Sequence, residues 1–417
     1  MNVNDIARLA AAQPENRALD RAFYTDPDIY RLEIERILMR CWLYAGHISE
    51  IPRVGDWFLY ELDGESVIII RAAEDRVNAL VNVCRHRGSR VCIEPKGRGR
   101  LLTCRYHGWS YDADGALRKA AHMGEDLDRE TLGLKSLPCE LLDGMIFINF
   151  AADPAPLDEA RGELGACLAP YDLGNAKVAH RQSYPMRANW KLAVENYCEC
   201  YHCAPAHPEY SRGHSLADPD HKHADRYAAM HERAIACGLS AVELDRKYLD
   251  APGFGAGYGY SRYPLVRGHV TGSRDGQPVA PLLGTIRDYF GGCTDFEVGP
   301  VTFALAYPDH VVIYAFKPLA HDRADCDITW LVRGDAEEGR DYDRDELVWL
   351  WDVTTEADKR IIERNAEGVN SRFYEPGPLS DMEYYTWAFL AWYLEALKSP
   401  SGPGDAEAPR PVEAVGA

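Results

Sequence analysis

Two short cysteine–histidine pairs constrain the fold of this chain more than any other feature of its sequence. The first pair is Cys84-Arg-His86 and the second is Cys104-Arg-Tyr-His107. Thiolates and imidazoles are both metal ligands, so a metal centre that used all four would tie together two loops that are separate in the sequence. The fold must therefore bring these two loops to one point.

Two kinds of metal centre use two cysteines and two histidines. A zinc finger usually pairs C-x2-C with H-x3-5-H around a helix. A Rieske [2Fe–2S] centre holds one iron by two cysteines and the other by two histidines, so each loop contributes one of each. That is the order here, and residues 97–103 show no helical pattern. The sequence therefore favours the Rieske centre, and the predicted cluster ligands are Cys84, His86, Cys104 and His107.

Short apolar or alternating runs surround the two pairs. They read D-W-F-L-Y-E-L, S-V-I-I-I-R, V-N-A-L-V-N-V and M-I-F-I-N-F, and they are bounded by Gly, Asp and Pro. Such runs are typical of strands. We predict an all-β domain over residues 46–155. A helical segment over residues 1–45 precedes it and is expected to pack on the C-terminal domain, residues 156–398.

Further helices are predicted from apolar residues at helical spacing. They cover residues 27–42, the later half of 348–368, and 381–397. Asp26 is the expected N-cap of the first, with Pro27 at its first helical position. Thr354 or Thr355 is the expected N-cap of the second.

A second metal-ligating pattern occupies residues 189–207, N-W-K-L-A-V-E-N-Y-C-E-C-Y-H-C-A-P-A-H. Glu195, Glu199 and His202 follow at steps of four and three, so on a helix they share one face. This spacing predicts two carboxylates and an imidazole on the same side.

The next histidine breaks this pattern. His207 comes five residues after His202, which places it off that face on an unbroken helix. Pro205 lies between them, and proline cannot continue a regular helix. We expect a break there to turn both imidazoles toward one point. Two histidines with a distant carboxylate and open coordination positions form the non-haem Fe(II) oxygenase site.

The two motifs together resemble the catalytic α subunits of Rieske-type non-haem iron oxygenases. The second motif is written N-W-K-x-x-x-E-N-x-x-x-x-Y-H-x-x-x-x-H. The resemblance runs over residues 24–397. It implies an α+β fold, with an all-β Rieske domain and a helix-grip catalytic domain over residues 156–398, in which an antiparallel sheet wraps a long helix. Residues 399–417 are rich in Pro, Gly, Ala and acidic residues and are predicted to be disordered.

The resemblance also implies the ligands of the mononuclear iron. His202 and His207 match the family's two histidines. The third ligand is an acid on a C-terminal helix, where Asp358 aligns best and Asp352 is the second candidate.

Two further roles follow from the resemblance. Glu199 matches an acid that hydrogen-bonds the iron-ligand histidine of one subunit and a cluster histidine of its neighbour. Asn196 matches an asparagine near the iron.

The implied assembly is a head-to-tail homotrimer, and whether small β subunits join it stays open. Electrons from NAD(P)H would arrive through a separate reductase or ferredoxin, because the chain shows no G-x-G-x-x-G motif. Fe(II) would then activate O2 beside a small-molecule substrate.

The substrate is less tightly constrained. Glutamate at position 199 and the run V-N-S-R-F-Y-E-P-G-P-L-S at 369–380 are similar to the quaternary-amine branch of the family, whose members hydroxylate an N-methyl group and release formaldehyde. The leading hypothesis is betaine-like N-demethylation. Hydroxylation of an aromatic ring or acid is the alternative enzyme function. A non-catalytic electron carrier or ligand-binding module is the third, against which the second iron site argues.

Composition and charge exclude several classes of function. The formal net charge of −19 argues against binding to nucleic acid, whose phosphates would be repelled. No apolar run approaches the roughly 18 residues that span a bilayer. The N-terminus lacks a basic region followed by an apolar core, so we expect no signal peptide and a cytoplasmic location.

The cysteines and arginines add two expectations. The 12 cysteines should be thiols or metal ligands rather than disulfides, because the cytoplasm is reducing. Three of them, Cys198, Cys200 and Cys203, are expected to be small buried residues. Arginines crowd the first motif, which suits an acidic redox partner; they are Arg85, Arg87, Arg90, Arg98, Arg100 and Arg105.

Overall fold

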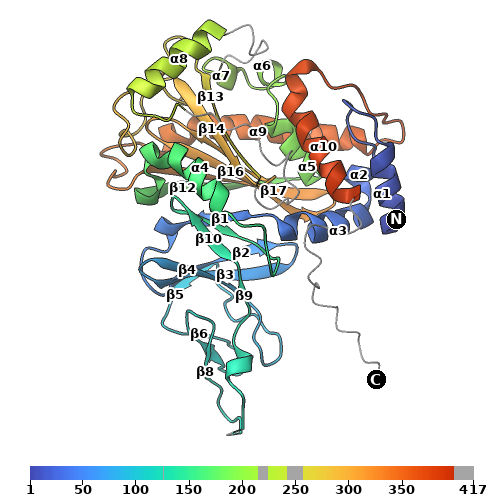
Figure 1. The fold of residues 1–417 in the computed structure, drawn as a ribbon, viewed down its shortest axis with the longest axis vertical. Coiled ribbons are helices and arrows are strands. Elements are labelled where there is room, and N and C mark those ends of the chain that lie inside the picture. The colour runs from blue at the N-terminus through green and yellow to red at the C-terminus, as the bar shows by residue number, and fades with distance from the viewer. Residues whose placement is uncertain (125, 215–223, 242–256, 399–417) are drawn as a thin grey trace.

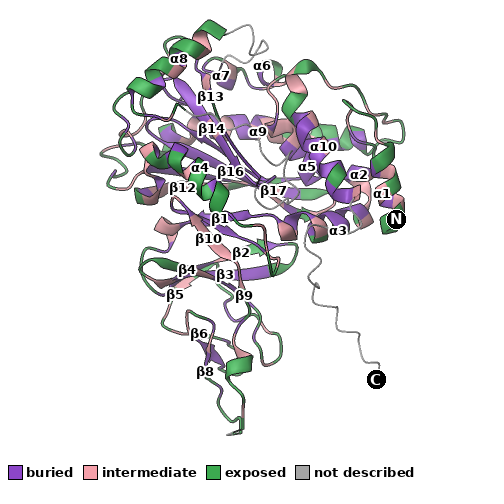
Figure 2. Cartoon of the chain, viewed as in Figure 1, coloured by how far each residue is buried: buried purple, intermediate pink, exposed green. Residues whose placement is uncertain are grey.

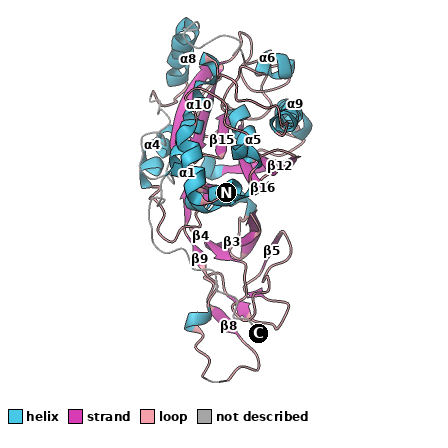
Figure 3. Ribbon diagram, turned by 90° about the vertical axis from the view of Figure 1, so that its right-hand side faces the viewer, coloured by secondary structure: helices cyan, strands magenta, loops and turns pink. Residues whose placement is uncertain are grey.

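The chain folds into a lower part built of strands and an upper part in which helices cover a large sheet (Figure 1). The structure is a computed structural model, and it describes residues 1–124, 126–214, 224–241 and 257–398. Viewed from the side, nearly all helices lie in the upper part (Figure 3). The predicted disordered tail, 399–417, lies outside the described residues.

The N-terminal segment contains several short helices as far as Arg40 and then becomes a strand. It contains α1 (Val3–Ala12), α2 (Ala22–Thr25), α3 (Pro27–Arg36) and a 3-10 turn (Leu38–Arg40). Asp26 caps α3 as predicted, because its carboxylate accepts the N–H of Asp28 at 2.7 Å. The predicted helix over 27–42 is wrong at its end, since the chain tightens into the 3-10 turn and continues as β1 (Leu43–His47).

The lower part holds three antiparallel sheets. The strand orders are β5-β2-β3-β4-β9, β1-β11-β10 and β6-β7-β8. Ile68, Ile70 and Leu80 are fully buried between the first sheet and the cysteine–histidine loops. The strands are β2 (Asp56–Leu62), β3 (Glu65–Ala73), β4 (Arg76–Val81), β5 (Lys96–Arg98), β6 (Leu102–Thr103), β7 (Ser110–Tyr111), β8 (Leu117–Lys119), β9 (Ser136–Leu137), β10 (Cys139–Leu142) and β11 (Met145–Ile148).

A six-stranded antiparallel sheet forms the centre of the upper part, in the order β12-β17-β16-β15-β14-β13. All of its strands except β12 are buried along most of their length (Figure 2). The strands of this sheet are β12 (Ala176–Met186), β13 (Tyr258–Pro264), β14 (Gly292–Val298), β15 (Thr302–Ala306), β16 (Val311–Ala320) and β17 (Arg323–Arg333). One face packs on α5 (Trp190–Tyr197), α9 (Arg344–Val369) and α10 (Tyr384–Lys398), and the other on α4 (Asp158–Leu168) and α8 (Ala224–Ala236).

This arrangement confirms the predicted α+β class, with a strand-built domain and an antiparallel sheet against a long helix. The long helix α9 begins earlier than predicted. Asp343 is its N-cap, because its carboxylate accepts the N–H groups of Asp345 and Glu346. Thr354 and Thr355 are therefore not caps but buried positions inside the helix.

A buried ion pair fixes α5 against the N-terminal helices. Lys191 on α5 donates to Glu33 on α3 at 2.6 Å, and both side chains are fully buried. Glu33 also accepts from the indole of Trp190 at 2.8 Å and the hydroxyl of Tyr393 at 2.5 Å. The carboxylate is thus satisfied by three donors, and the start of α5 is tied to α3 and α10.

Replacing Lys191 by methionine is expected to lower the free energy of unfolding by about 3–5 kcal/mol, because the Glu33 carboxylate would stay buried without its counter-charge. Chemical unfolding followed by tryptophan fluorescence measures this loss. Lys398→Met is the matched control, since it breaks the exposed pair with Glu395 and should cost under about 0.5 kcal/mol. Equal losses for the two variants would contradict a structural role for the buried pair.

Candidate metal centres

The two cysteine–histidine loops have the same backbone design. Cys84 N–H donates to Ser89 O at 2.8 Å, and Gly88 N–H donates back to Cys84 O at 2.9 Å. The same two bonds close the second loop, between Cys104, Gly108 and Trp109. Gly88 and Gly108 adopt φ of +78° and +73°, a conformation that favours glycine. The repeated sequence pattern therefore folds into a pair of matching turns.

These turns bring the four predicted cluster ligands together. The Nδ1 atoms of His86 and His107 lie 3.2 Å apart, and the thiols of Cys84 and Cys104 are buried behind them. His107 is exposed and His86 half-exposed. Buried sulfurs and outward imidazoles fit a two-iron cluster, in which the cysteines hold the inner iron and the histidines the outer one. Trp109 stacks on His86 with ring centroids 4.8 Å apart, so it packs against one of the predicted cluster ligands.

The second motif breaks earlier than predicted. Helix α5 ends at Tyr197, residues 198–202 form a turn, and α6 (Cys203–Ala206) contains Pro205. His207 then separates α6 from α7 (Pro208–Ser211). Pro205 is therefore not the break point, because a four-residue helix accommodates it.

The early end of α5 also separates the two glutamates that were expected to share a face. Glu195 lies on α5 and accepts a hydrogen bond from Tyr24 at 2.9 Å. Burial raises the pKa of Glu195 to about 8. Glu199 lies in the turn and contacts His202 instead. The prediction of one shared face is wrong, and Glu195 joins α5 to the N-terminal helices.

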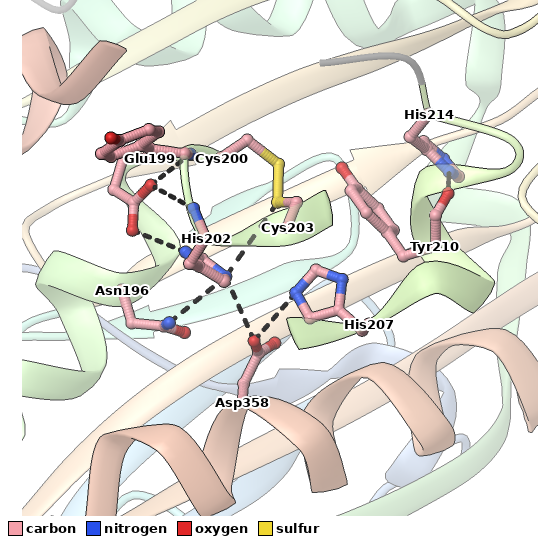
Figure 4. Close-up of a disulfide and its surroundings, with 10 residues drawn as sticks. Asn196, Glu199, Cys200, His202, Cys203, His207, Tyr210, His214 and Asp358 are labelled. Carbon is pink, nitrogen blue, oxygen red and sulfur yellow. Dashed lines mark hydrogen bonds and ion pairs between the residues drawn. A yellow bond between two sulfur atoms is a disulfide. The ribbon is translucent and has the colours of Figure 1, made fainter. Parts of the chain in front are cut away.

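His202, His207 and Asp358 converge as predicted for a metal site (Figure 4). The Nε2 atoms of the two histidines lie 3.2 and 3.1 Å from the same oxygen, Oδ1 of Asp358 on α9. His207 is 2% exposed, and neither of its ring nitrogens makes a hydrogen bond. Burial raises the pKa of Asp358, but the two imidazoles outweigh it and lower the pKa overall. Nε2 of His207 and Oδ1 of Asp358 are buried, face one another and have no hydrogen-bond partner, which fits a bound cation.

Glu199 orients the first of these histidines. Its Oε1 lies 2.5 Å from Nδ1 of His202, and its Oε2 accepts the backbone N–H of His202 at 3.2 Å. Burial lowers the pKa of His202, yet the carboxylates of Asp358 and Glu199 raise it to about 9. A carboxylate at Nδ1 keeps a proton there and leaves Nε2 for a metal. Asn196 Nδ2 lies 3.3 Å from the same Nε2 (Figure 4).

The second candidate acid lies elsewhere. Asp352 is six residues before Asp358 on α9 and therefore projects from another side of the helix. Its Oδ1 accepts from Tyr184 at 2.8 Å and from Gln182 at 3.2 Å, both on β12. The geometry favours Asp358 over Asp352.

One cysteine prediction is wrong. Cys200 and Cys203 form a disulfide that brackets His202 (Figure 4). The ligand atoms of His202, Cys203 and His207 lie within 4.8 Å of one another, but the sulfur of Cys203 is bonded to Cys200 and is not a thiolate. The spacing of the two cysteines, with two residues between them, was the signal for this pairing.

Comparison with known families agrees with this geometry. Residues 41–138 match the model of the Rieske [2Fe-2S] domain, and residues 173–399 match that of the ring hydroxylating alpha subunit catalytic domain. The chain belongs to the Rieske-type non-haem iron oxygenases. Its two domains imply a [2Fe–2S] cluster and a non-haem iron. Within the described residues of this oxygenase, no helix is long and apolar enough to cross a membrane.

The oxygenase is similar to characterised relatives over most of its length. It is 35% identical to the glycine betaine monooxygenase oxygenase subunit of Pseudomonas aeruginosa (strain UCBPP-PA14), over 94% of this chain and 91% of that one. It is 26% identical to the carnitine monooxygenase oxygenase subunit of Escherichia coli (strain K12), over 84% of each. The solved structure of the quaternary ammonium Rieske monooxygenase CntA has the same fold, with a TM-score of 0.73 at 20% identity, covering 94% of this chain and 98% of that one.

Tyr111 is a residue of the cluster loops to which no role was assigned from the sequence. Its hydroxyl accepts the N–H of Arg85 at 3.0 Å, which directs its own proton toward Sγ of Cys84 at 3.3 Å. The signal was its place at the end of the segment that holds the second cysteine–histidine pair, C-R-Y-H-G-W-S-Y at 104–111.

Replacing Tyr111 by phenylalanine should lower the reduction potential of the cluster by on the order of 40 mV, because a hydrogen bond to a cysteine sulfur stabilises the reduced, more negative state by roughly 1 kcal/mol more than the oxidised one. Redox titration of the visible absorption measures this shift. Tyr106→Phe is the control, since that side chain is exposed on the same loop. A potential that stays within a few millivolts of wild type for Tyr111→Phe would contradict this role.

Proposed function

We propose that this oxygenase hydroxylates an N-methyl group of a small, betaine-like quaternary amine. The observation that carries the proposal is the 35% identity, over 94% of the chain, to glycine betaine monooxygenase oxygenase subunits. In the reaction, O2, two electrons and two protons convert one N–CH3 group to N–CH2OH and water. The carbinol then breaks its C–N bond and releases formaldehyde, a proton and the dimethylated amine.

The proposed ligands follow from the two sites. Cys84, His86, Cys104 and His107 would hold the cluster, and His202, His207 and Asp358 the iron. A bound Fe(II) with open positions would supply O2 activation. The chain's own groups prepare that site: Glu199 keeps the Nδ1 proton on His202, and Asn196 places an amide beside its Nε2.

The remaining components are also proposals. Figure 1 places β6–β8, beside the cluster loops, at the lower end of the molecule and α6, beside the iron site, near the upper end. The cluster loops and the iron site of one subunit thus lie toward opposite ends of the molecule (Figure 1). In a head-to-tail homotrimer, the exposed His107 of one subunit would lie beside Glu199 of its neighbour. NAD(P)H electrons would come through a separate reductase or ferredoxin in the cytoplasm. We propose no nucleic-acid or membrane partner.

The test is to combine the oxygenase with a reductase and NADH, and to supply glycine betaine or benzoate as the substrate. Formaldehyde should form with glycine betaine and not with benzoate. A ring diol from benzoate, with no formaldehyde from glycine betaine, would refute the proposal in favour of aromatic hydroxylation. Relatives of that activity, such as benzene 1,2-dioxygenase subunit alpha of Pseudomonas putida, match 44% of the chain.

A further inference from the structure

Asp295 is a carboxylate within the sheet face that packs on the iron-site helices. It lies on β14, a strand in which the other six positions are buried and Asp295 alone keeps part of its surface accessible. Side chains alternate along a strand, so Asp295 projects to the same face as Cys293. Its partner on β15 is Leu305, and both Cys293 and Leu305 belong to the core that includes α5 and α9. The side chain is therefore directed toward the helices that position the candidate iron ligands.

Aromatic rings gather on this same face. Tyr197, at the end of α5, stacks on Phe303 of β15 with ring centroids 4.5 Å apart, and Tyr314 of β16 lies 5.2 Å from it. The hydroxyl of Tyr197 is buried and makes no hydrogen bond. Tyr263 on β13 pairs with Cys293, two residues from Asp295. Rings from several separate elements thus lie on the face toward which the acid projects.

Tyr210 connects this group of rings to the iron site. Its ring lies edge-on to His207 with centroids 5.2 Å apart (Figure 4). It also lies 5.6 Å from the ring of Trp351 on α9. Trp351 in turn lies 6.0 Å from Tyr314 between ring centroids. Tyr210 and Tyr314 belong to the same core as Cys293 and Leu305, the residues beside Asp295 on its face of the sheet. Ring contacts therefore lead from His207 to the face that carries Asp295.

We propose that Asp295, with Tyr197, Tyr210 and Tyr263, recognises the trimethylammonium group of the substrate. This inference rests on the proposed function and assigns its specificity to particular residues. A cationic nitrogen gains from the faces of tyrosine rings and from a nearby carboxylate, and both gains grow where water is excluded. A neutral aromatic ring would gain nothing from the carboxylate and would bury it at a cost. The site should therefore distinguish a substrate by charge as well as shape.

Equilibrium binding tests the proposal without turnover. The probes are glycine betaine and 3,3-dimethylbutanoate, in which a neutral carbon replaces the charged nitrogen, titrated calorimetrically into the oxidised, iron-loaded protein without O2. Wild type should bind glycine betaine at least about tenfold more tightly than the neutral isostere. Asp295→Asn should weaken glycine betaine binding at least about tenfold and leave the isostere within about twofold.

Two further variants sharpen the result. Asp325→Asn removes the same charge from β17, where Asp325 alternates with the inward-facing Cys326, so it should bind both probes like wild type. Tyr197→Leu should weaken glycine betaine more than the isostere, and it keeps the test open if Asp295→Asn does not fold. Iron content and cluster absorption report folding. If either Asp295→Asn or Tyr197→Leu binds glycine betaine as tightly as wild type, the inference is wrong while the proposed function still stands. A wild-type protein that binds no trimethylammonium compound overturns the proposed function as well.

Discussion

Asp358→Ala is expected to lose the mononuclear iron and to abolish product formation while the Rieske cluster remains. Asp358 Oδ1 lies within 3.2 Å of both histidine Nε2 atoms, so alanine removes the atom on which the site converges. Loss of a direct ligand should cost more than the roughly 10- to 100-fold typical of an outer hydrogen-bond partner. Iron and acid-labile sulfide per chain measure it, with iron falling from about three to about two atoms while sulfide stays constant.

Asp352→Asn is the matched control for this variant. It changes an acid on the same helix that is hydrogen-bonded to Tyr184 and Gln182, and it should keep the full iron content. If Asp358→Ala kept wild-type iron and Asp352→Asn lost one atom per chain, the third ligand would be Asp352.

Glu199→Gln is expected to leave both metal centres loaded and to slow electron transfer from the cluster to the iron by roughly 10- to 100-fold. The amide cannot hold the proton on His202 Nδ1 as a carboxylate does at 2.5 Å, and it removes the charge that we place between two subunits. Stopped-flow absorbance of the reduced cluster, mixed with O2 and substrate, measures its oxidation directly. Product formed per cluster oxidised should fall in parallel.

Glu195→Gln provides the comparison within the same motif. Glu195 is buried against Tyr24, and its pKa of about 8 leaves it mostly protonated at pH 7, so the amide is a close substitute. Cluster oxidation should keep its wild-type rate in this variant. Turnover by Glu199→Gln at the wild-type rate would refute the bridging role of Glu199.

The metal centres were the most predictable part of this protein, because metal ligands follow local rules of spacing. The order of cysteine and histidine in the two pairs was enough to favour a Rieske centre over a zinc finger and to bring the two loops to one point. His202 and His207 followed from the same reasoning. The choice between Asp358 and Asp352 needed the fold, since it depends on which side of α9 faces the histidines.

Features that depend on tertiary contacts were missed or misplaced. Helix α5 ends at Tyr197 rather than at Pro205, and the chain beyond it brings His202 and His207 to Asp358 on a distant helix, a contact that no local pattern indicates. The start of α9 depends on a cap at Asp343, upstream of the periodic segment that was recognised. The pair of Lys191 and Glu33 joins two helices that are far apart in the sequence, so no local pattern indicates it.

The most direct test of the proposed N-demethylation is a single turnover by the oxygenase alone. The chemically reduced protein is mixed with glycine betaine and O2 in the absence of a reductase, and formaldehyde and the dimethylated amine are quantified against the cluster oxidised. The proposal predicts that the two products appear in equal amounts as the cluster is oxidised. Oxidation of the cluster with all of the glycine betaine recovered intact would contradict it.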